Sequence, residues 1–522
     1  MKTKSNFLLL STIVGGILFN LLFWSEKLGL NLFIYSVFVL IITSVNRDIA
    51  KHRKFIVYAT LHLLAALLVI INNSNLSLAG YYISFGLFIG FSHYQQIRTV
   101  WMAFLATLLQ IVGVPVSLVI CLSAFRIGNF SLRPIFRIIR YIAIPIIILF
   151  VFTAIYSGAN AIFGSYLDAI LSGMQTALTS LFNFIFQDLS FERFIHICFG
   201  TALSGGLIIT FYNHIVEKIE LTQQDELERK KAKSKIMALW GELVRIFAGQ
   251  ITSKKLALKT EYIIGLISFS SLNLLIFVLN GIDILSLWFG DDIYTTANYA
   301  AELHDGTNAL IFSIVLAMAI IIYFFRGNLN FYTKSQPMKI LAIVWMIQNL
   351  ILIISVLIRD AHYVTVYGLT YKRIGVGIFA LLCIVGLVTV YVKVAQRKTV
   401  FYLLRINGNI WFGLLIFFSI FNWDIFITRY NLNHSETTPV DMDYLLSLSD
   451  KTLPILDENK NRLWPIDSNE AVEIQAKKSS ANPYQARLDK RIQFFKERYA
   501  TVSWLSWNLP DARTANYFGI KR

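Results

Sequence analysis

Residues 339–358 read KILAIVWMIQNLILIISVLI, and Lys339 at the start is their only charged residue. A helix of about 20 residues crosses the roughly 30 Å hydrocarbon core of a bilayer. Lipid offers the backbone no hydrogen-bond partners, so an isolated apolar run must form a helix, which satisfies its own N–H and C=O groups. This stretch therefore predicts a membrane-spanning helix.

Similar apolar runs recur along the chain, and each is about long enough to span. They cover residues 7–24, 28–45, 55–71, 77–97, 101–124, 139–157, 193–212, 261–280, 306–325, 374–392 and 400–422. Of the 522 residues, 56% are hydrophobic and 15% are charged, whereas about a quarter of a soluble domain is charged. We expect an all-α polytopic membrane protein with about 11–12 transmembrane helices.

The span count contains one ambiguity. The stretches 46–54 and 125–140 are both rich in Lys and Arg, which places both in the cytoplasm. Three apolar runs separate them, and three spans cannot join two loops on one side. Either 77–97 or 101–124 does not fully cross, or 125–140 lies outside. We favour the first alternative, because Gly113 and Pro115 can break or kink the second run.

Loop charge also predicts the orientation, because Lys and Arg accumulate on cytoplasmic loops. The basic stretches at the N-terminus, 213–260, 326–338 and 393–398 are expected in the cytoplasm. The acidic loop 281–305 has no Lys or Arg and is expected outside. The last span then places the C-terminal domain outside the cytoplasm.

The chain divides into N-terminal transmembrane helices (1–125), a core transmembrane domain (126–422) and a small, mainly helical C-terminal extracytoplasmic soluble domain (423–522). In 159–187 and 236–247, apolar residues recur at helical spacing with polar residues between them, which predicts interfacial helices. In the C-terminal domain, 484–502 carries an apolar stripe after Asn482 and Pro483, a typical helix start.

The net charge of +16 is explained by Lys and Arg on the cytoplasmic loops of a membrane protein. Cations on cytoplasmic loops lie beside anionic lipid, so we expect lipid head groups near loop 213–260 and no nucleic acid. The three cysteines lie within separate apolar runs without metal-ligand spacing. They are expected to be small buried hydrophobes, and no cofactor is predicted.

The acidic loop provides the first candidate site. Asp291, Asp292, Glu302, His304 and Asp305 lie close together in the sequence. Carboxylates with a histidine can bind a divalent cation or relay protons. The alternative is a solvated loop that is acidic because outer loops lack Lys and Arg.

A second candidate lies at the outer ends of two predicted helices. It comprises the string from Arg359 through Asp360 to His362, with Tyr367, Tyr371, Lys372 and Arg373. These charged residues either form ion pairs with the acidic loop, which would hold the extracellular ends of the helices together, or bind an anion.

Two ionisable residues lie within predicted spans. An ionisable group in lipid should face the bundle interior, so His62 is either a proton carrier or a hydrogen-bonded packing residue. Arg405 lies near the cytoplasmic end of the last span and is expected to snorkel. Asn407 and Asn409 are expected beside it in a polar pocket.

Several strings resemble one family. They are SGANAIF (157–163), IDILSLWFG (282–290), YAAELHDG (299–306), YGLTYKRI (367–374), FITRYNL (426–432), DMDYLLSL (441–448) and WLSWNL (504–509). Their order and spacing over residues 139–510 resemble the bacterial multi-pass membrane family called domain of unknown function 4173. The resemblance implies a bacterial inner-membrane location and supplies no activity.

Three classes of function remain open. Transport of a small solute or lipid fits the number of spans. A sensor, regulatory or scaffold protein fits an outer domain that could bind a protein partner. An envelope-facing enzyme would use the acidic loop, although no GxSxG, Walker A, HExxH or kinase motif is present. A water-accessible cavity lined by His62 or Arg405 would favour transport, and a sealed bundle with a grooved outer domain would favour sensing. The sequence does not predict the oligomeric state.

Overall fold

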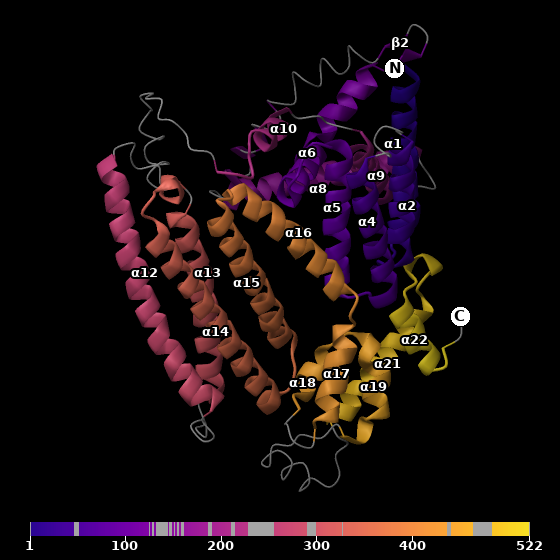
Figure 1. Ribbon diagram of the computed structural model, residues 1–522. Helices are drawn as coiled ribbons and strands as arrows, with labels where there is room; N and C mark the ends of the chain where they lie inside the picture. Colours follow the sequence, from indigo (N-terminus) through magenta and orange to yellow (C-terminus); the bar gives the residue numbers. More distant parts are fainter. Residues whose placement is uncertain are drawn as a thin grey trace. The chain divides into compact units, whose positions relative to one another are not determined.

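The computed structural model describes residues 2–45, 52–124, 126–127, 130–131, 145, 149–150, 152–153, 156–157, 161–185, 190–209, 214–227, 255–289, 299–325, 327–435, 440–462 and 483–520. Its regular elements are helices, apart from a short hairpin of β1 (Arg126–Ile127) and β2 (Phe130–Ser131) (Figure 1). The chain forms two compact units. Unit 1 comprises Met1–Ile97, Met102–Lys218 and Val502–Leu509, and unit 2 comprises Arg98–Trp101, Ile219–Thr501 and Pro510–Arg522.

Unit 1 is built from closely packed apolar helices. These are α1 (Lys2–Phe23), α2 (Leu30–Ser44), α4 (Arg53–Asn72), α5 (Asn75–His93), most of α6 (Val100–Ala124), α8 (Ala161–Ile185) and α9 (Phe191–Ile208). A Cβ on Gly16 would lie 1.9 Å from Oγ1 of Thr201, and one on Gly90 would lie 2.1 Å from the carbonyl oxygen of Ala103. Glycine therefore permits α1 to approach α9, and α5 to approach α6.

Three sequence expectations concern unit 1. Helix α6 continues through Pro115, so the expected break is absent; membrane helices tolerate proline where neighbouring groups satisfy the freed carbonyl. Helix α8 coincides with the predicted interfacial helix 159–187, and its apolar Ile162 and Tyr166 are 70% and 69% exposed. Cys198 is exposed on α9, which corrects the expectation that every cysteine is buried.

A segment from the C-terminal region closes the turn between α1 and α2 within unit 1. The hydroxyl of Ser506 donates a hydrogen bond to the carboxylate of Glu26, and the N–H of Leu30 donates to the carbonyl of Trp507 at 3.0 Å. The WLSWNL string (504–509) therefore packs on the N-terminal helices.

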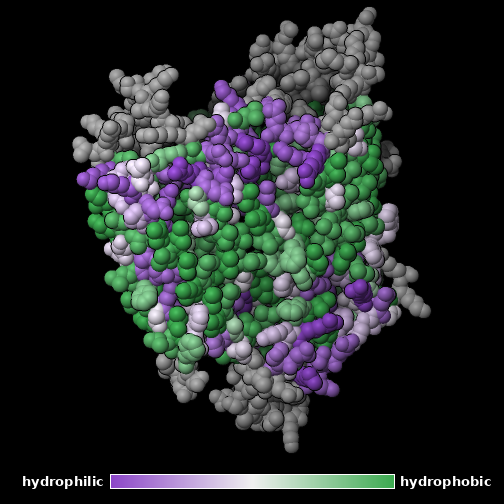
Figure 2. Space-filling view, in the orientation of Figure 1, coloured by the Kyte–Doolittle hydropathy of each residue, from purple (hydrophilic) through white to green (hydrophobic). Residues whose placement is uncertain are grey.

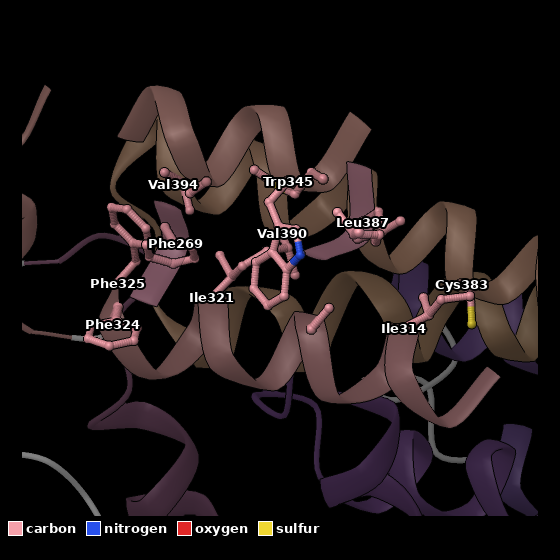
Figure 3. Close-up of a cluster of buried hydrophobic side chains, with 14 of the residues drawn as sticks. Phe269, Ile314, Ile321, Phe324, Phe325, Trp345, Cys383, Leu387, Val390 and Val394 are labelled. Carbon is pink, nitrogen blue, oxygen red and sulfur yellow. The ribbon is translucent and has the colours of Figure 1, made fainter. Parts of the chain in front are cut away.

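Unit 2 contains a bundle of five long helices. These are α12 (Lys255–Asp283), α13 (Tyr299–Phe324), α14 (Gln336–Tyr367), α15 (Tyr371–Gln396) and α16 (Val400–Ser419). The aromatic side chains of Phe269, Phe325 and Trp345 pack among aliphatic residues such as Ile321 and Val390 in a buried core (Figure 3). The ends of the expected acidic loop 281–305 are helical here, because α12 continues into a π-helical turn, η1 (Ile284–Trp288), and α13 begins at Tyr299.

The remainder of unit 2 is mainly a small helical domain, which we call the C-terminal helical domain. It contains α17 (Trp423–Asn433), α18 (Met442–Ser447), the 3-10 turn η3 (Asp450–Thr452), α19 (Leu453–Glu458), α21 (Pro483–Ala500) and α22 (Leu509–Tyr517). The predicted stripe on 484–502 is confirmed, since Leu488, Ile492, Phe495 and Tyr499 of α21 are buried. They form the core of the domain with Ile427, Leu445 and Leu453.

The chain is an all-α, multi-pass membrane protein, as its composition predicts. Among the residues that the structure describes, six segments are long and apolar enough to cross a membrane: Asn6–Phe23, Arg53–Asn72, Leu258–Trp288, Gln336–Tyr367, Tyr371–Gln396 and Val400–Ser419. Shorter apolar helices occupy Leu30–Ser44, Val100–Val114 and Ala309–Phe324. Over α12 to α16, hydrophobic residues cover the middle of the helices and hydrophilic residues gather at their ends (Figure 2).

Candidate functional site

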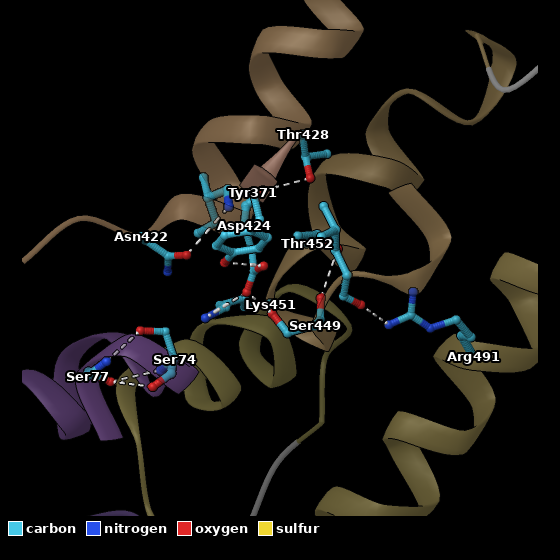
Figure 4. Close-up of polar contacts among 12 residues, drawn as sticks. Ser74, Ser77, Tyr371, Asn422, Asp424, Thr428, Ser449, Lys451, Thr452 and Arg491 are labelled. Carbon is cyan, nitrogen blue, oxygen red and sulfur yellow. Dashed lines mark hydrogen bonds and ion pairs between the residues drawn. The ribbon is translucent and has the colours of Figure 1, made fainter. Parts of the chain in front are cut away.

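Polar contacts bind the turn between α14 and α15 to the C-terminal helical domain, and we call these contacts the junction. Tyr371 is the first residue of α15. Its hydroxyl donates a hydrogen bond to Oδ1 of Asp424 at 2.7 Å, and its backbone N–H donates to the hydroxyl of Tyr444 at 2.9 Å. Figure 4 shows the ring of Tyr371 directed at the carboxylate of Asp424. Two helices of the domain, α17 and α18, thus hold the start of a spanning helix.

Asp424 forms a buried ion pair at the centre of the junction. Burial by itself would raise the pKa of this carboxyl, which is 6% exposed. The Lys451 ammonium, 2.9 Å from Oδ2, and the hydroxyls of Ser449 and Tyr371 outweigh burial and hold the pKa below its usual range. Asp424 is therefore ionised at neutral pH and depends on Lys451 for compensation of its charge.

Asn431 of α17 binds the backbone of the α14–α15 turn. Its Nδ2 donates to the carbonyl of Leu369 at 2.9 Å, and its Oδ1 accepts from the N–H of Leu369 at 2.6 Å. Gly368 precedes this contact with φ +77°, and a Cβ on it would lie 2.8 Å from Oδ1 of Asn431. Glycine is required here both for its backbone conformation and for the close approach of the amide.

A small pocket opens beside these contacts. It is lined by Tyr367, Gly368, Thr370, Asn431, His434, Val440, Asp441 and Tyr444. These residues come from or adjoin the strings YGLTYKRI, FITRYNL and DMDYLLSL, which lie far apart in the sequence. The junction therefore brings together, around this small pocket, three stretches that the sequence had singled out.

A second polar feature, which we call the seam, runs between α12 and α14. Nδ2 of Asn273 donates to the carbonyl of Leu341 at 3.0 Å, and Nδ2 of Asn280 donates to the carbonyl of Gln348 at 3.0 Å. Nε2 of Gln348 donates to Oδ1 of Asn273 at 2.8 Å. From the first of these bonds to the second, the donor moves from residue 273 to residue 280 and the acceptor from residue 341 to residue 348. Both steps are seven residues in the same direction, so the two helices run parallel with a coiled-coil repeat.

An ion pair lies at one end of the seam. Arg359 of α14 pairs with Asp283, the last residue of α12, which is 2% exposed. The π-helical turn η1 begins at the next residue, and Nε1 of its Trp288 donates to the hydroxyl of Ser355 at 3.2 Å. Buried charges in spanning segments and π-helical turns both concentrate at functional sites.

Residues 36–459 match the family model described as domain of unknown function (DUF4153). This chain belongs to the DUF4153 family. The predicted resemblance to domain of unknown function 4173 is therefore wrong. The strings that suggested it are short and aromatic, and polytopic membrane proteins share such composition at helix ends. No curated protein and no solved structure matches the chain.

The DUF4153 match covers the seam and most of the junction. It includes Tyr371, Asp424 and Lys451, and it ends before α21 begins at Pro483. The family description assigns no activity.

His62 lies in unit 1 within the DUF4153 range and is 0% exposed. Its Nδ1 lies 3.0 Å from the hydroxyl of Ser84, and its Nε2 lies 3.0 Å from the hydroxyl of Ser36. The ring also stacks on Phe85. Both nitrogens are occupied by serine hydroxyls, which is the geometry of a hydrogen-bonded packing residue.

Arg405, which the sequence predicts to snorkel, forms an ion pair. Its Nη2 lies 2.8 Å from Oδ2 of Asp225. Asp225 belongs to residues 222–227, which we call the strap, and the strap is hydrogen-bonded to the turn between α15 and α16 through Leu227 and Thr399. Asn407 bonds to Thr389 at 2.9 Å instead of accompanying Arg405, and Asn409 is exposed.

The second sequence candidate is partly dispersed in the structure. Arg373 places its guanidinium 4.2 Å from the ring centroid of Tyr363, a cation–π contact, and Asp360 is half-buried. His362 and Lys372 are exposed. Arg359, from the same string, pairs with Asp283 from the acidic stretch 281–305, so at least one of these charges joins two helices.

The candidate site in the acidic loop lies largely outside the residues that the structure describes. Glu302, His304 and Asp305 fall on the backbone of α13, but their side chains lie outside the described residues. Asp291 and Asp292 lie outside them altogether, as does the predicted interfacial helix 236–247. A metal or proton site at these carboxylates stays a prediction.

Sequence reasoning missed most of the side chains that make the junction and the seam. Asp424, Lys451 and Asn431 were not singled out as site residues. A signal was present for the seam, because Asn273 and Asn280 interrupt one apolar run at heptad spacing and Gln348 interrupts another.

Proposed function

We propose that this protein is a membrane sensor or regulatory protein whose C-terminal helical domain acts on the spanning helices α14 and α15. The observation that carries the proposal is the hydrogen bond of Tyr371 to Asp424, which joins the first residue of a spanning helix to a buried ion pair of the domain. A water-accessible cavity lined by His62 or Arg405 would have favoured transport, and both side chains are bonded to protein groups.

A rigid helix connects the junction to the strap. Helix α15 has 26 residues and extends about 39 Å at 1.5 Å per residue. At its other end, the buried ammonium of Lys393 donates to the carbonyl of Phe325, just after α13, at 2.6 Å. The following turn binds the strap through two backbone hydrogen bonds, both of 2.9 Å. The N–H of Leu227 donates to the carbonyl of Arg397, and the N–H of Thr399 donates to the carbonyl of Asp225. Movement at Tyr371 is thereby passed to the strap.

The test is hydrogen exchange in the full chain, reconstituted in lipid nanodiscs. Tyr371→Phe removes only the hydroxyl that binds Asp424. We expect amide exchange to rise at Leu227 and Thr399 as well as at the α14–α15 turn. The matched control is Arg487→Ala, which breaks an exposed ion pair with Asp443 in the same domain. Exchange that changes only around residues 364–374 and in the C-terminal helical domain would overturn the proposal.

Transport of a small solute or lipid is the second candidate, and the seam favours it. Amide and charged side chains lie between two spanning helices, where polar groups mark solute pathways in many membrane proteins. Proteoliposomes are challenged with glycerol or urea and followed by light scattering, and lipid scrambling is followed with a fluorescent phospholipid. Rates equal to those of empty vesicles would exclude this candidate for the solutes and the lipid used.

The proposed location is the bacterial inner membrane, with the N-terminus in the cytoplasm and the C-terminal helical domain outside it. This orientation rests on loop charge. It implies that the basic stretch 213–260, which includes the strap, lies beside anionic head groups, and that the C-terminal helical domain could meet a protein partner outside the cytoplasm. Alkaline phosphatase fused after Arg522 should be active and a fluorescent protein fused there should be dark. The opposite result would reverse the orientation.

A further inference from the structure

We infer that the end of the seam around Asp283 and Asn280 binds water within the membrane. This inference concerns a separate part of the bundle from the junction and does not depend on the proposed sensor function. It assigns the seam a ligand class, namely small neutral molecules that both donate and accept hydrogen bonds, with water as the occupant.

The first observation is a set of buried polar atoms without a hydrogen-bond partner. Among the residues that the structure describes, these include Oδ1 of Asn280, Oε1 of Gln348, Oδ2 of Asp283 and Nε of Arg359. Asn280 and Asp283 are 4% and 2% exposed. An unpaired polar group costs several kcal/mol in hydrocarbon, so such atoms require a partner.

The second observation is the arrangement of these atoms. Asn280 and Asp283 are three residues apart on α12 and therefore share one helix face, directed at α14. Reversing the Asn280 amide would bring its oxygen against the carbonyl oxygen of Gln348, which now accepts from Nδ2 at 3.0 Å. The unpaired oxygen of Asn280 is thus fixed by its neighbours.

The kinds of atom that lack a partner indicate which ligand they bind. Three of the atoms accept hydrogen bonds and one donates, and the adjacent charges of Asp283 and Arg359 already neutralise each other. A bare cation would be repelled by Arg359, and an anion by Asp283. Water supplies both donors and acceptors and carries no charge, so water molecules can bond to the acceptor oxygens and to the donor of this set.

The route follows the end of the seam. Helix α12 changes from α to π geometry directly after Asp283, so the regular helical hydrogen-bonding pattern changes where the ion pair lies. The side chain of Arg359 is 18% exposed, whereas that of Asp283 is 3% exposed, so the ion pair reaches from the surface of the bundle into the seam. Water enters beside Arg359 and reaches Asn280.

The experiment is cysteine accessibility in the full chain in proteoliposomes, with the native Cys121, Cys198 and Cys383 replaced by alanine. A charged, membrane-impermeant methanethiosulfonate reagent modifies a cysteine only where water reaches the sulfur. The test variant is Asn280→Cys. Its matched controls are Ile276→Cys, one turn earlier and 8% exposed in the apolar core, and Val278→Cys on the lipid-exposed face, 53% exposed.

We expect Asn280→Cys to react at least tenfold faster than both controls. Ser355→Cys, an almost isosteric change beside Trp288, is the second test variant in case Asn280→Cys does not fold, and the same ratio is expected. Folding of every variant is checked by gel filtration. Rates at positions 280 and 355 equal to those at positions 276 and 278 would overturn the inference and would leave the junction proposal untouched.

Discussion

The ammonium of Lys451 lies 2.9 Å from Oδ2 of Asp424, and both side chains are buried, with 4% and 9% of their surface exposed. The pair joins η3 to the first turn of α17, and the same carboxylate accepts the hydroxyl of Tyr371. A buried charge that loses its partner keeps its desolvation cost without compensation. The stability of the whole junction therefore depends on this carboxylate.

Asp424→Asn should destabilise the junction by about 3 kcal/mol, because it removes the carboxylate that pairs with the buried ammonium of Lys451. Native-state hydrogen exchange at α17 and α18 measures the free energy of local opening, and exchange there should accelerate roughly a hundredfold. Adding Lys451→Met to Asp424→Asn should restore part of the loss, since the buried charge is removed. A double variant that is less stable than the single variant would contradict this account.

The pH dependence of this stabilisation follows from the lowered pKa of Asp424. The folded carboxyl releases its proton below the ordinary value of 3.8, so its contribution is complete above that pH and is lost as the pH falls through the folded pKa. The difference in thermal unfolding temperature between the wild-type protein and Asp424→Asn should therefore stay constant from pH 8 to about pH 5. It should shrink as the pH falls below 3.8. A difference that persists unchanged at pH 2 would exclude ionisation of Asp424 as its source.

Gly368→Ala should open the junction without touching its charges. The glycine has φ +77°, and an added Cβ meets Oδ1 of Asn431 at 2.8 Å, so we expect a cost of about 1–3 kcal/mol. Exchange of the Leu369 amide, which Asn431 binds, is the readout. The control is Gly377→Ala within α15, where a Cβ meets nothing within 4 Å and should stabilise the helix by about 0.5–1 kcal/mol. Equal effects of the two substitutions would show that the conformation of Gly368 is unimportant.

The sequence predicts the membrane fold well, because the length and apolarity of runs such as 339–358 are local properties that lipid alone constrains. Pro115 does not end α6, and its effect on a helix depends on neighbouring helices that a sequence does not show. The junction could not be predicted because Tyr371, Asp424 and Lys451 lie far apart in the chain, and each is unremarkable among its neighbours. Only their meeting in three dimensions makes an ion pair, whereas the heptad spacing of Asn273 and Asn280 was visible as a pattern.

Gly90→Ala tests helix packing in unit 1. A Cβ at this position would lie 2.1 Å from the carbonyl oxygen of Ala103, and backbone cannot move aside as a side chain can, so α5 and α6 must separate. We expect a loss of about 1–3 kcal/mol, seen as a lower thermal unfolding temperature in detergent. The control is Gly413→Ala in α16, where a Cβ meets nothing within 4 Å and the gain in helix propensity is the same. If Gly90→Ala unfolded at the temperature of Gly413→Ala, the close contact of α5 with α6 would be disproved, because no helix pair tolerates a carbon atom at that distance from a carbonyl oxygen.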